Sequence, residues 1–257
     1  MQEMRRSGRF LSCLLVIFFL IVTTSGCAWW RKEPEPNPQA MYENAMNLFQ
    51  RKKYERAAEA FKRFKEEFPL SDYTPLVELR IADSYFFDKN YAEAIVQYEE
   101  FRKLHPTHAE IPYVIYQLGM CHYRQMLSLD RDQTETEKAI EQFRYLIENH
   151  PQSPQASEAS IRMKVAIKQL ADHEYYIARF YLRMKKYKAA LGRFEAVLQK
   201  YPGLGFEERI KPLIVKCQEE IGKEEQKRKE KEAGEEKEKE ELEEKKKVRA
   251  QDTEKSG

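Results

Sequence analysis

Hydrophobic and polar positions follow a pattern that returns four times along the chain, at residues 54–69, 91–106, 137–151 and 187–202. Each copy has an alanine, an aromatic residue four positions later and a proline eight positions after that. The spacing grows from 37 residues (57 to 94) to 45 (94 to 139) and 51 (139 to 190), identically for all three anchors. Chance similarity would not keep these internal distances, so the chain is built from repeats. The anchors are Ala57, Ala94, Ala139 and Ala190, then Phe61, Tyr98, Phe143 and Phe194, then Pro69, Pro106, Pro151 and Pro202.

Each copy predicts a helix that its proline ends, because proline cannot continue a helix. A partner helix should precede each copy, since prolines that suit a first helical turn stand there. These prolines are Pro38, Pro75, Pro112 and Pro154. Small residues fall where the paired helices would cross, at Ala45, Ala82 and Gly119. The pattern resembles the tetratricopeptide repeat, a pair of antiparallel helices A and B.

The extra residues that lengthen the later spacings fall in two places. Eight extra residues fall in the polar stretch 127–134, which predicts a loop between the helices of repeat three. Residues 155–186 contain neither proline nor glycine, which predicts one long helix A in repeat four. Residues 206–221 predict a fifth helix A without a recognisable helix B. We therefore predict an all-α fold, a tetratricopeptide-repeat α-solenoid of about five repeats over residues 38–222, the fifth incomplete.

The last 35 residues, 223–257, hold 12 Lys/Arg and 13 Asp/Glu. Leu242 and Val248 are their only larger aliphatic side chains. Such a segment has no apolar stripe to bury, so no packed core is expected there. Glu-to-Lys pairs one turn apart could sustain a lone exposed helix here. Disorder or a frayed helix is the state that this composition favours.

The N-terminus has the features of a bacterial lipoprotein signal. Three arginines precede an apolar run from Phe10 to Val22, which is too short to span a bilayer. The following Thr24-Ser25-Gly26-Cys27 resembles a lipobox, with Thr24 where leucine is usual. We predict a signal peptide (1–26), lipidation of Cys27 including palmitate, and a tether (27–37). An uncleaved anchor with a chance cysteine is the alternative. Ala28 in place of Asp favours the outer membrane, by resemblance to enteric lipoproteins.

Composition argues against several other classes of protein. The net charge of +2 is too balanced for nucleic acid to be the default partner. Nine glycines are few for a phosphate-binding enzyme, and the four cysteines and five histidines show no metal-ligand spacing. No nucleophile, base and orienting group stand together in any known motif. We predict a protein that is not an enzyme and uses no cofactor or metal.

Two segments are similar to the BamD family, the tetratricopeptide lipoproteins of the outer-membrane β-barrel assembly machinery (BAM complex). They are residues 130–159, which include the loop DRDQT, and residues 174–202, which include FYLRMKKYKAA. The resemblance implies a scaffold on the periplasmic face of the outer membrane. It implies binding of the central barrel subunit, through its periplasmic domain, and of unfolded outer-membrane protein precursors. It also implies that Arg193 faces the central subunit. Another periplasmic tetratricopeptide lipoprotein, such as a pilus-secretin pilotin or a cell-wall factor, remains the alternative.

Helix A residues outside the anchors should line the concave surface of such an array. An aromatic and Met-containing surface suits an extended, adaptable peptide. A core role for any one of them stays open. In the third-repeat loop, Asp130, Arg131 and Asp132 suit helix capping or loop salt bridges and are too few for a metal site. The predicted peptide-groove residues are Tyr42, Met46, Phe49, Asp83, Phe86 and Phe87.

Overall fold

The computed structural model describes residues 37–255. Over this range the chain is helical and contains no strand. The helices are α2 (Pro38–Gln50), α3 (Tyr54–Glu67), α4 (Thr74–Phe87), α5 (Tyr91–Leu104), α6 (Ile111–Arg124), α7 (Thr134–Asn149), α8 (Pro154–Arg183), α9 (Tyr187–Lys200) and α10 (Glu207–Lys255). The predicted lipobox, Cys27 and most of the tether lie outside the described residues.

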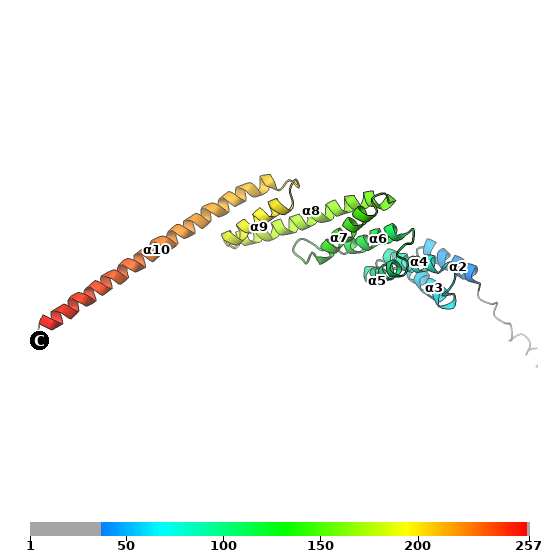
Figure 1. The fold of residues 1–257 in the computed structure, drawn as a ribbon, viewed down its shortest axis with the longest axis horizontal. Helices are drawn as coiled ribbons and strands as arrows, with labels where there is room; N and C mark the ends of the chain where they lie inside the picture. The colour runs from blue at the N-terminus through cyan, green and yellow to red at the C-terminus, as the bar shows by residue number, and fades with distance from the viewer. Residues whose placement is uncertain (1–36, 256–257) are drawn as a thin grey trace, which may run out of the picture.

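Each helix packs against the next one along the chain, which gives a row of helix pairs (Figure 1). This order defines a tetratricopeptide-repeat α-solenoid, as predicted. The predicted starting prolines occupy the first or second position of α2, α4, α6 and α8. The predicted loop of repeat three lies between α6 and α7, and the predicted long helix A is the 30-residue α8.

The repeat anchors form the core. Phe61, Tyr98, Phe143 and Phe194 are each 0% exposed, as are the four anchor alanines. Three apolar clusters follow one another along the array: one under α2–α4, one under α4–α8 and one under α8–α10. Helix α8 takes part in both of the last two clusters, so it joins the middle of the array to its C-terminal end (Figure 1).

Three turns between helices A and B have a lysine in the left-handed conformation. Lys52, Lys89 and Lys185 have φ angles of 58°, 64° and 55°. After the first of them, the Lys53 amide donates to the Leu48 carbonyl at 2.9 Å, a bond that closes the end of α2. The left-handed residue reverses the chain within a very short turn, at a conformational cost that glycine would not carry.

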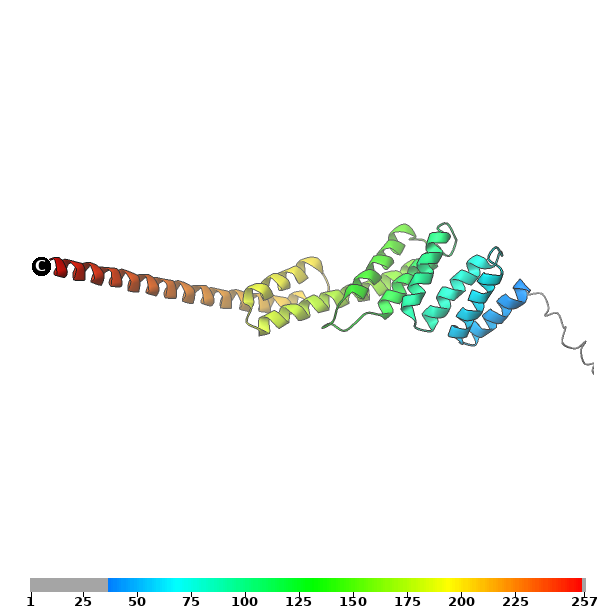
Figure 2. The same ribbon diagram turned by 90° about the horizontal axis from the view of Figure 1, so that it is seen from below.

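The charged C-terminal segment is helical as far as the structure describes it. Helix α10 continues without a break from the fifth helix A to Lys255 (Figure 2). The reason is local: pairs such as Arg228–Glu232 and Lys231–Glu235 lie one turn apart on the exposed helix. Its last described contact with the array is the 2.9 Å ion pair between Glu225 and Lys188 of α9.

Candidate partner-binding surfaces

Three of the predicted groove residues belong to an aromatic cluster that joins the first two repeats. Phe49 lies edge-on to Phe87, with ring centroids 5.7 Å apart, and Tyr54 stacks on Phe87 at 5.4 Å. Phe86 contacts Phe87 at 5.4 Å and Tyr91 at 5.7 Å. Phe49 and Phe86 are therefore half-buried by their neighbours, while Phe87 stays 44% exposed. The cluster offers an aromatic surface rather than an open pocket.

The other two apolar groove residues pack between the first repeat and the start of the second. Tyr42 stacks on Tyr73, with centroids 5.1 Å apart, and lies 6.1 Å from the ring of Phe61. Met46 packs against the first core cluster and is partly exposed. Both side chains keep one accessible side, so contact with a peptide remains a prediction for them.

Asp83 was wrongly predicted to line the groove. It is 0% exposed, and its Oδ1 accepts hydrogen bonds from the hydroxyls of Tyr98 (2.6 Å) and Tyr113 (2.8 Å). Its Oδ2 pairs with Arg80 Nη1 at 2.6 Å. Burial raises the pKa of the Asp83 carboxyl, although these three hydrogen bonds oppose the rise. Asp83 therefore ties α4 to α5 and α6 rather than meeting a ligand.

Arg80 is the surface residue that the sequence did not indicate. Asp83 holds one end of its guanidinium group, whose centre lies 5.9 Å from the ring centroid of Phe49. Its side chain is 30% exposed. The spacing Arg80-x-x-Asp83 places the two groups one helical turn apart and is the only sequence signal for this pair.

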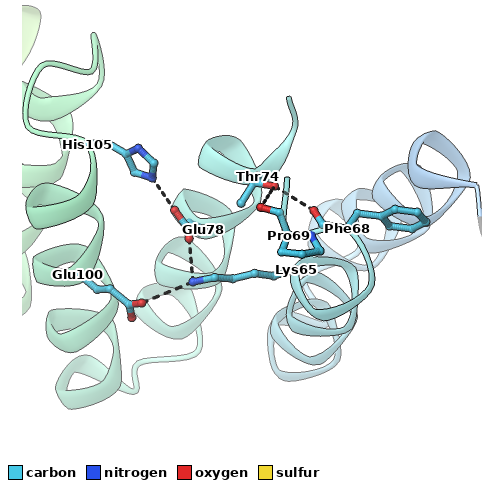
Figure 3. A network of polar contacts seen from close by, with 7 residues as sticks. All are labelled: Lys65, Phe68, Pro69, Thr74, Glu78, Glu100 and His105. Atoms are coloured by element: carbon cyan, nitrogen blue, oxygen red, sulfur yellow. Dashed lines mark hydrogen bonds and ion pairs between the residues drawn. The ribbon is translucent and has the colours of Figure 1, made fainter. Parts of the chain in front are cut away.

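A second polar network connects the first two repeats, as Figure 3 shows. Glu78 of α4 accepts from Lys65 of α3 at 2.7 Å and from His105, just beyond α5, at 2.6 Å. Lys65 also lies 3.5 Å from Glu100. Burial alone would raise the pKa of Glu78, but the hydrogen bonds and charges of Lys65 and His105 lower it. The network thus joins α3 of the first repeat to α4 and α5 of the second.

Arg193 lies half-exposed on α9, at the edge of the buried stripe formed by Ala190, Phe194 and Val197. Its Nη1 is 3.4 Å from Glu174 of α8, and its guanidinium carbon lies 5.1 Å from the ring centroid of Tyr181. Both charged side chains are partly open to solvent, 42% for Arg193 and 36% for Glu174. An external carboxylate can therefore compete for Arg193.

The loop of repeat three is held by its own side chains and by α8. Asp132 accepts from the Thr134 amide at 2.9 Å, and Asp130 accepts from the Ser128 hydroxyl at 2.6 Å. These hydrogen bonds lower the pKa of both carboxyls and hold the loop's own conformation. From α8, Gln169 donates to the Leu127 carbonyl and His173 to that of Leu129. The loop thus braces the middle of α8.

No group of three or more His, Cys, Asp or Glu side chains between residues 37 and 255 is arranged to hold a metal ion. One surface hollow, of about 510 Å³, lies at the turn between the first two repeats and is lined by Pro38 and residues 67–72. None of the helices in Figure 1 is both long and apolar enough to cross a membrane.

The paired helices, with an aromatic surface at one end of the array and an accessible arginine at the other, define the class of protein: a tetratricopeptide-repeat α-solenoid. The family of outer membrane lipoproteins called YfiO matches residues 34–233. The chain belongs to this family, which includes the BamD proteins.

Curated relatives are called outer membrane protein assembly factor BamD. The Rickettsia prowazekii protein is 31% identical over 198 residues, which cover 75% of this chain and 76% of that protein. The Caulobacter vibrioides protein is 28% identical over 184 residues, or 70% of this chain and 60% of that protein. The Vibrio cholerae protein is 27% identical over 179 residues, which cover 66% of this chain and 74% of that protein. The match thus spans less than two thirds of the Caulobacter protein.

Solved structures that resemble the chain are tetratricopeptide-repeat proteins. One from Thermus thermophilus has 16% identity and a TM-score of 0.39, covering 72% of this chain and 99% of that one. Another, from Parabacteroides merdae, has 13% identity and a TM-score of 0.37, covering 70% and 60%.

Proposed function

We propose that this protein is an outer-membrane lipoprotein scaffold that assists the assembly of β-barrel proteins. The family match over residues 34–233 carries the proposal, because it covers the whole repeat array. In this role the protein binds the central barrel subunit of the assembly machinery and receives unfolded outer-membrane protein precursors. It works by holding partners in place and not by catalysis.

Arg193 is the residue that we propose for the contact with the central subunit. It is half-exposed, and its internal partner Glu174 lies 3.4 Å away, so the internal pair is weak. A carboxylate on the partner's periplasmic domain would replace Glu174. The aromatic surface of Tyr42, Met46, Phe49, Phe86 and Phe87 is the proposed contact for precursors.

Co-purification from membranes in mild detergent tests the partner contact. Arg193→Glu should lose the barrel subunit, because repulsion replaces attraction across the interface. Arg63→Glu, the same reversal at an exposed arginine of α3, should keep it. The double variant Glu174→Arg/Arg193→Glu restores the internal ion pair but not the interface, so it should stay folded and still fail to co-purify. Recovery of the subunit with both Arg193 variants would remove this residue from the interface.

We further propose that acylation of Cys27 anchors the protein to the outer membrane. Cys27→Ala should then release the chain into the periplasm or leave it as an uncleaved precursor. Retention of the variant in outer-membrane fractions after a high-salt wash would contradict an anchor at Cys27. Recovery of a secretin ring in place of a barrel subunit would favour the pilotin alternative.

A further inference from the structure

The exposed face at the C-terminal end of α8 alternates apolar and basic side chains. Tyr176, Phe180 and Met184 are 37%, 44% and 55% exposed. Arg179 and Arg183 are exposed between them. Positions separated by three and four residues share one face of a helix, so these five side chains form a single stripe. No helix of the array covers this stripe.

The turn that follows the stripe is strongly basic. Residues 179–193 contain six Lys or Arg and no Asp or Glu. Lys188 and Arg193 pair with Glu225 and Glu174. Arg183, Lys185 and Lys186 form no ion pair with any residue that the structure describes. Their charges are therefore available to an external anion.

The neighbouring part of α10 does not cancel this charge. Just beyond Glu225, residues 226–234 of α10 hold four Lys or Arg and two Glu, so this stretch keeps a net charge of +2 even though Arg228 pairs with Glu232. The acidic stretch 235–244 begins ten residues past Glu225, about 15 Å farther along the helix axis. That separation exceeds the Debye length of about 8 Å at physiological salt. The α8–α9 turn also lies at the end of the array toward which α10 projects (Figure 1).

We propose that the end of the α8–α9 hairpin, residues 176–188, binds the surface of a membrane that contains anionic phospholipids. Lys and Arg reach lipid phosphates while aromatic and thioether side chains enter the interface, which is how amphipathic helices hold a bilayer surface. Charge alone would equally suit an acidic protein. The exposed Phe180 and Met184, on the free end of a hairpin, favour the planar, deformable surface of a bilayer. This contact does not depend on lipidation of Cys27.

Vesicle co-sedimentation tests the proposal with the chain from residue 28 onward, which carries no acyl anchor. All three core clusters lie between residues 41 and 217, so this chain retains the described fold. We expect binding to vesicles of phosphatidylcholine mixed with phosphatidylglycerol, weakened by salt, and little binding to phosphatidylcholine alone. Equal binding to both kinds of vesicle, or to neither, would overturn the proposal.

The first repeat supplies a matched control. Arg183→Glu/Lys185→Glu/Lys186→Glu should weaken binding by about a hundredfold or more, since each basic residue contributes about fivefold. Arg51→Glu/Lys52→Glu/Lys53→Glu makes the same charge change at the equivalent turn and should weaken binding far less.

Phe180→Ser/Met184→Ser keeps every charge and should weaken binding about tenfold, through lost apolar burial. Thermal unfolding confirms that each variant is folded. Equal losses in the two charge variants would mean that only net charge matters. A hairpin variant that keeps vesicle binding and instead loses a co-purifying acidic protein would assign the surface to that protein. Either result overturns the proposal.

Discussion

A Cβ atom added to Gly119 of α6 would lie 2.5 Å from Cε1 and 2.6 Å from Cδ1 of Phe143 in α7. Real Cβ atoms do not approach carbon this closely, so glycine is the residue that lets these two helices cross. Phe143 is 0% exposed and packed between Tyr116 and Tyr123, whose ring centroids lie 6.0 and 6.3 Å away. The ring therefore has little room to move aside.

Gly119→Ala should lower the free energy of unfolding by about 1–3 kcal/mol, the usual cost of overpacking a filled core. Gly192→Ala is the control, because nothing lies within 4 Å of its added Cβ. Alanine in a helix interior should raise stability there by about 0.5–1 kcal/mol. Urea denaturation of both variants measures the difference. A stabilised Gly119→Ala variant would contradict the close crossing.

The sequence predicted this crossing because the anchors mark helix contacts directly. The small residue of one helix lies against the aromatic residue of its partner helix, so the two anchors are the contact between the helices. The proline positions set the helix ends. The loop of repeat three and the long α8 were predicted from the extra residues that separate the later anchors. Each of these features depends on side chains that are buried at the same position in every repeat.

The burial of Asp83 could not be predicted in this way. A carboxylate in a helix A is ordinarily expected to be exposed. Asp83 is buried because Tyr98 and Tyr113, which belong to two other helices, both donate hydrogen bonds to it. After residue 223 no apolar stripe is available, and helix formation there depends on local pairing and not only on burial. Arg80 was missed because its role depends on Asp83.

Acidification should destabilise the protein through Glu78 and Glu135. The folded state lowers the pKa of both carboxyls. Burial would raise each pKa, but Lys65 and His105 outweigh burial at Glu78. His122 and Lys138 outweigh it in the same way at Glu135. A lowered folded-state pKa gives stability that is present above the unfolded pKa, about 4.3, and is lost as the pH falls through the folded value. The free energy of unfolding should therefore fall between about pH 5 and pH 3.

Glu78→Gln and Glu135→Gln should each flatten that fall. The two residues belong to different networks, so the double variant should combine both effects. The measurement is a series of urea titrations across this pH range. Curves that run parallel to the wild type would show that these carboxyls do not control acid stability.

Replacing a lysine in the left-handed conformation by glycine should stabilise the fold. Lys52→Gly should raise the free energy of unfolding by up to about 1 kcal/mol, because glycine accepts φ 58° without steric cost. Lys53→Gly should instead lower it by about 0.5–1 kcal/mol, since φ there is −90° and glycine only adds freedom to the unfolded chain. Thermal unfolding of this adjacent pair gives the comparison. A loss of stability at Lys52 would indicate that its side chain makes a contact worth more than the strain.

Deletion of residues 226–257 should leave the repeat array as stable as before. The described side chains beyond Glu225 are exposed, and the pair between Glu225 and Lys188 is retained. Exposed pairs along α10 contribute only about 0.2–0.5 kcal/mol each, and they stabilise α10 alone. Circular dichroism should show a loss of helical signal with an unchanged unfolding midpoint. As a control, Gly234→Ala in the full chain should raise the helical signal without moving the midpoint, because no atom lies within 4 Å of its added Cβ. A drop of several kcal/mol on deletion would mean that this segment folds back onto the fifth repeat as its missing helix B.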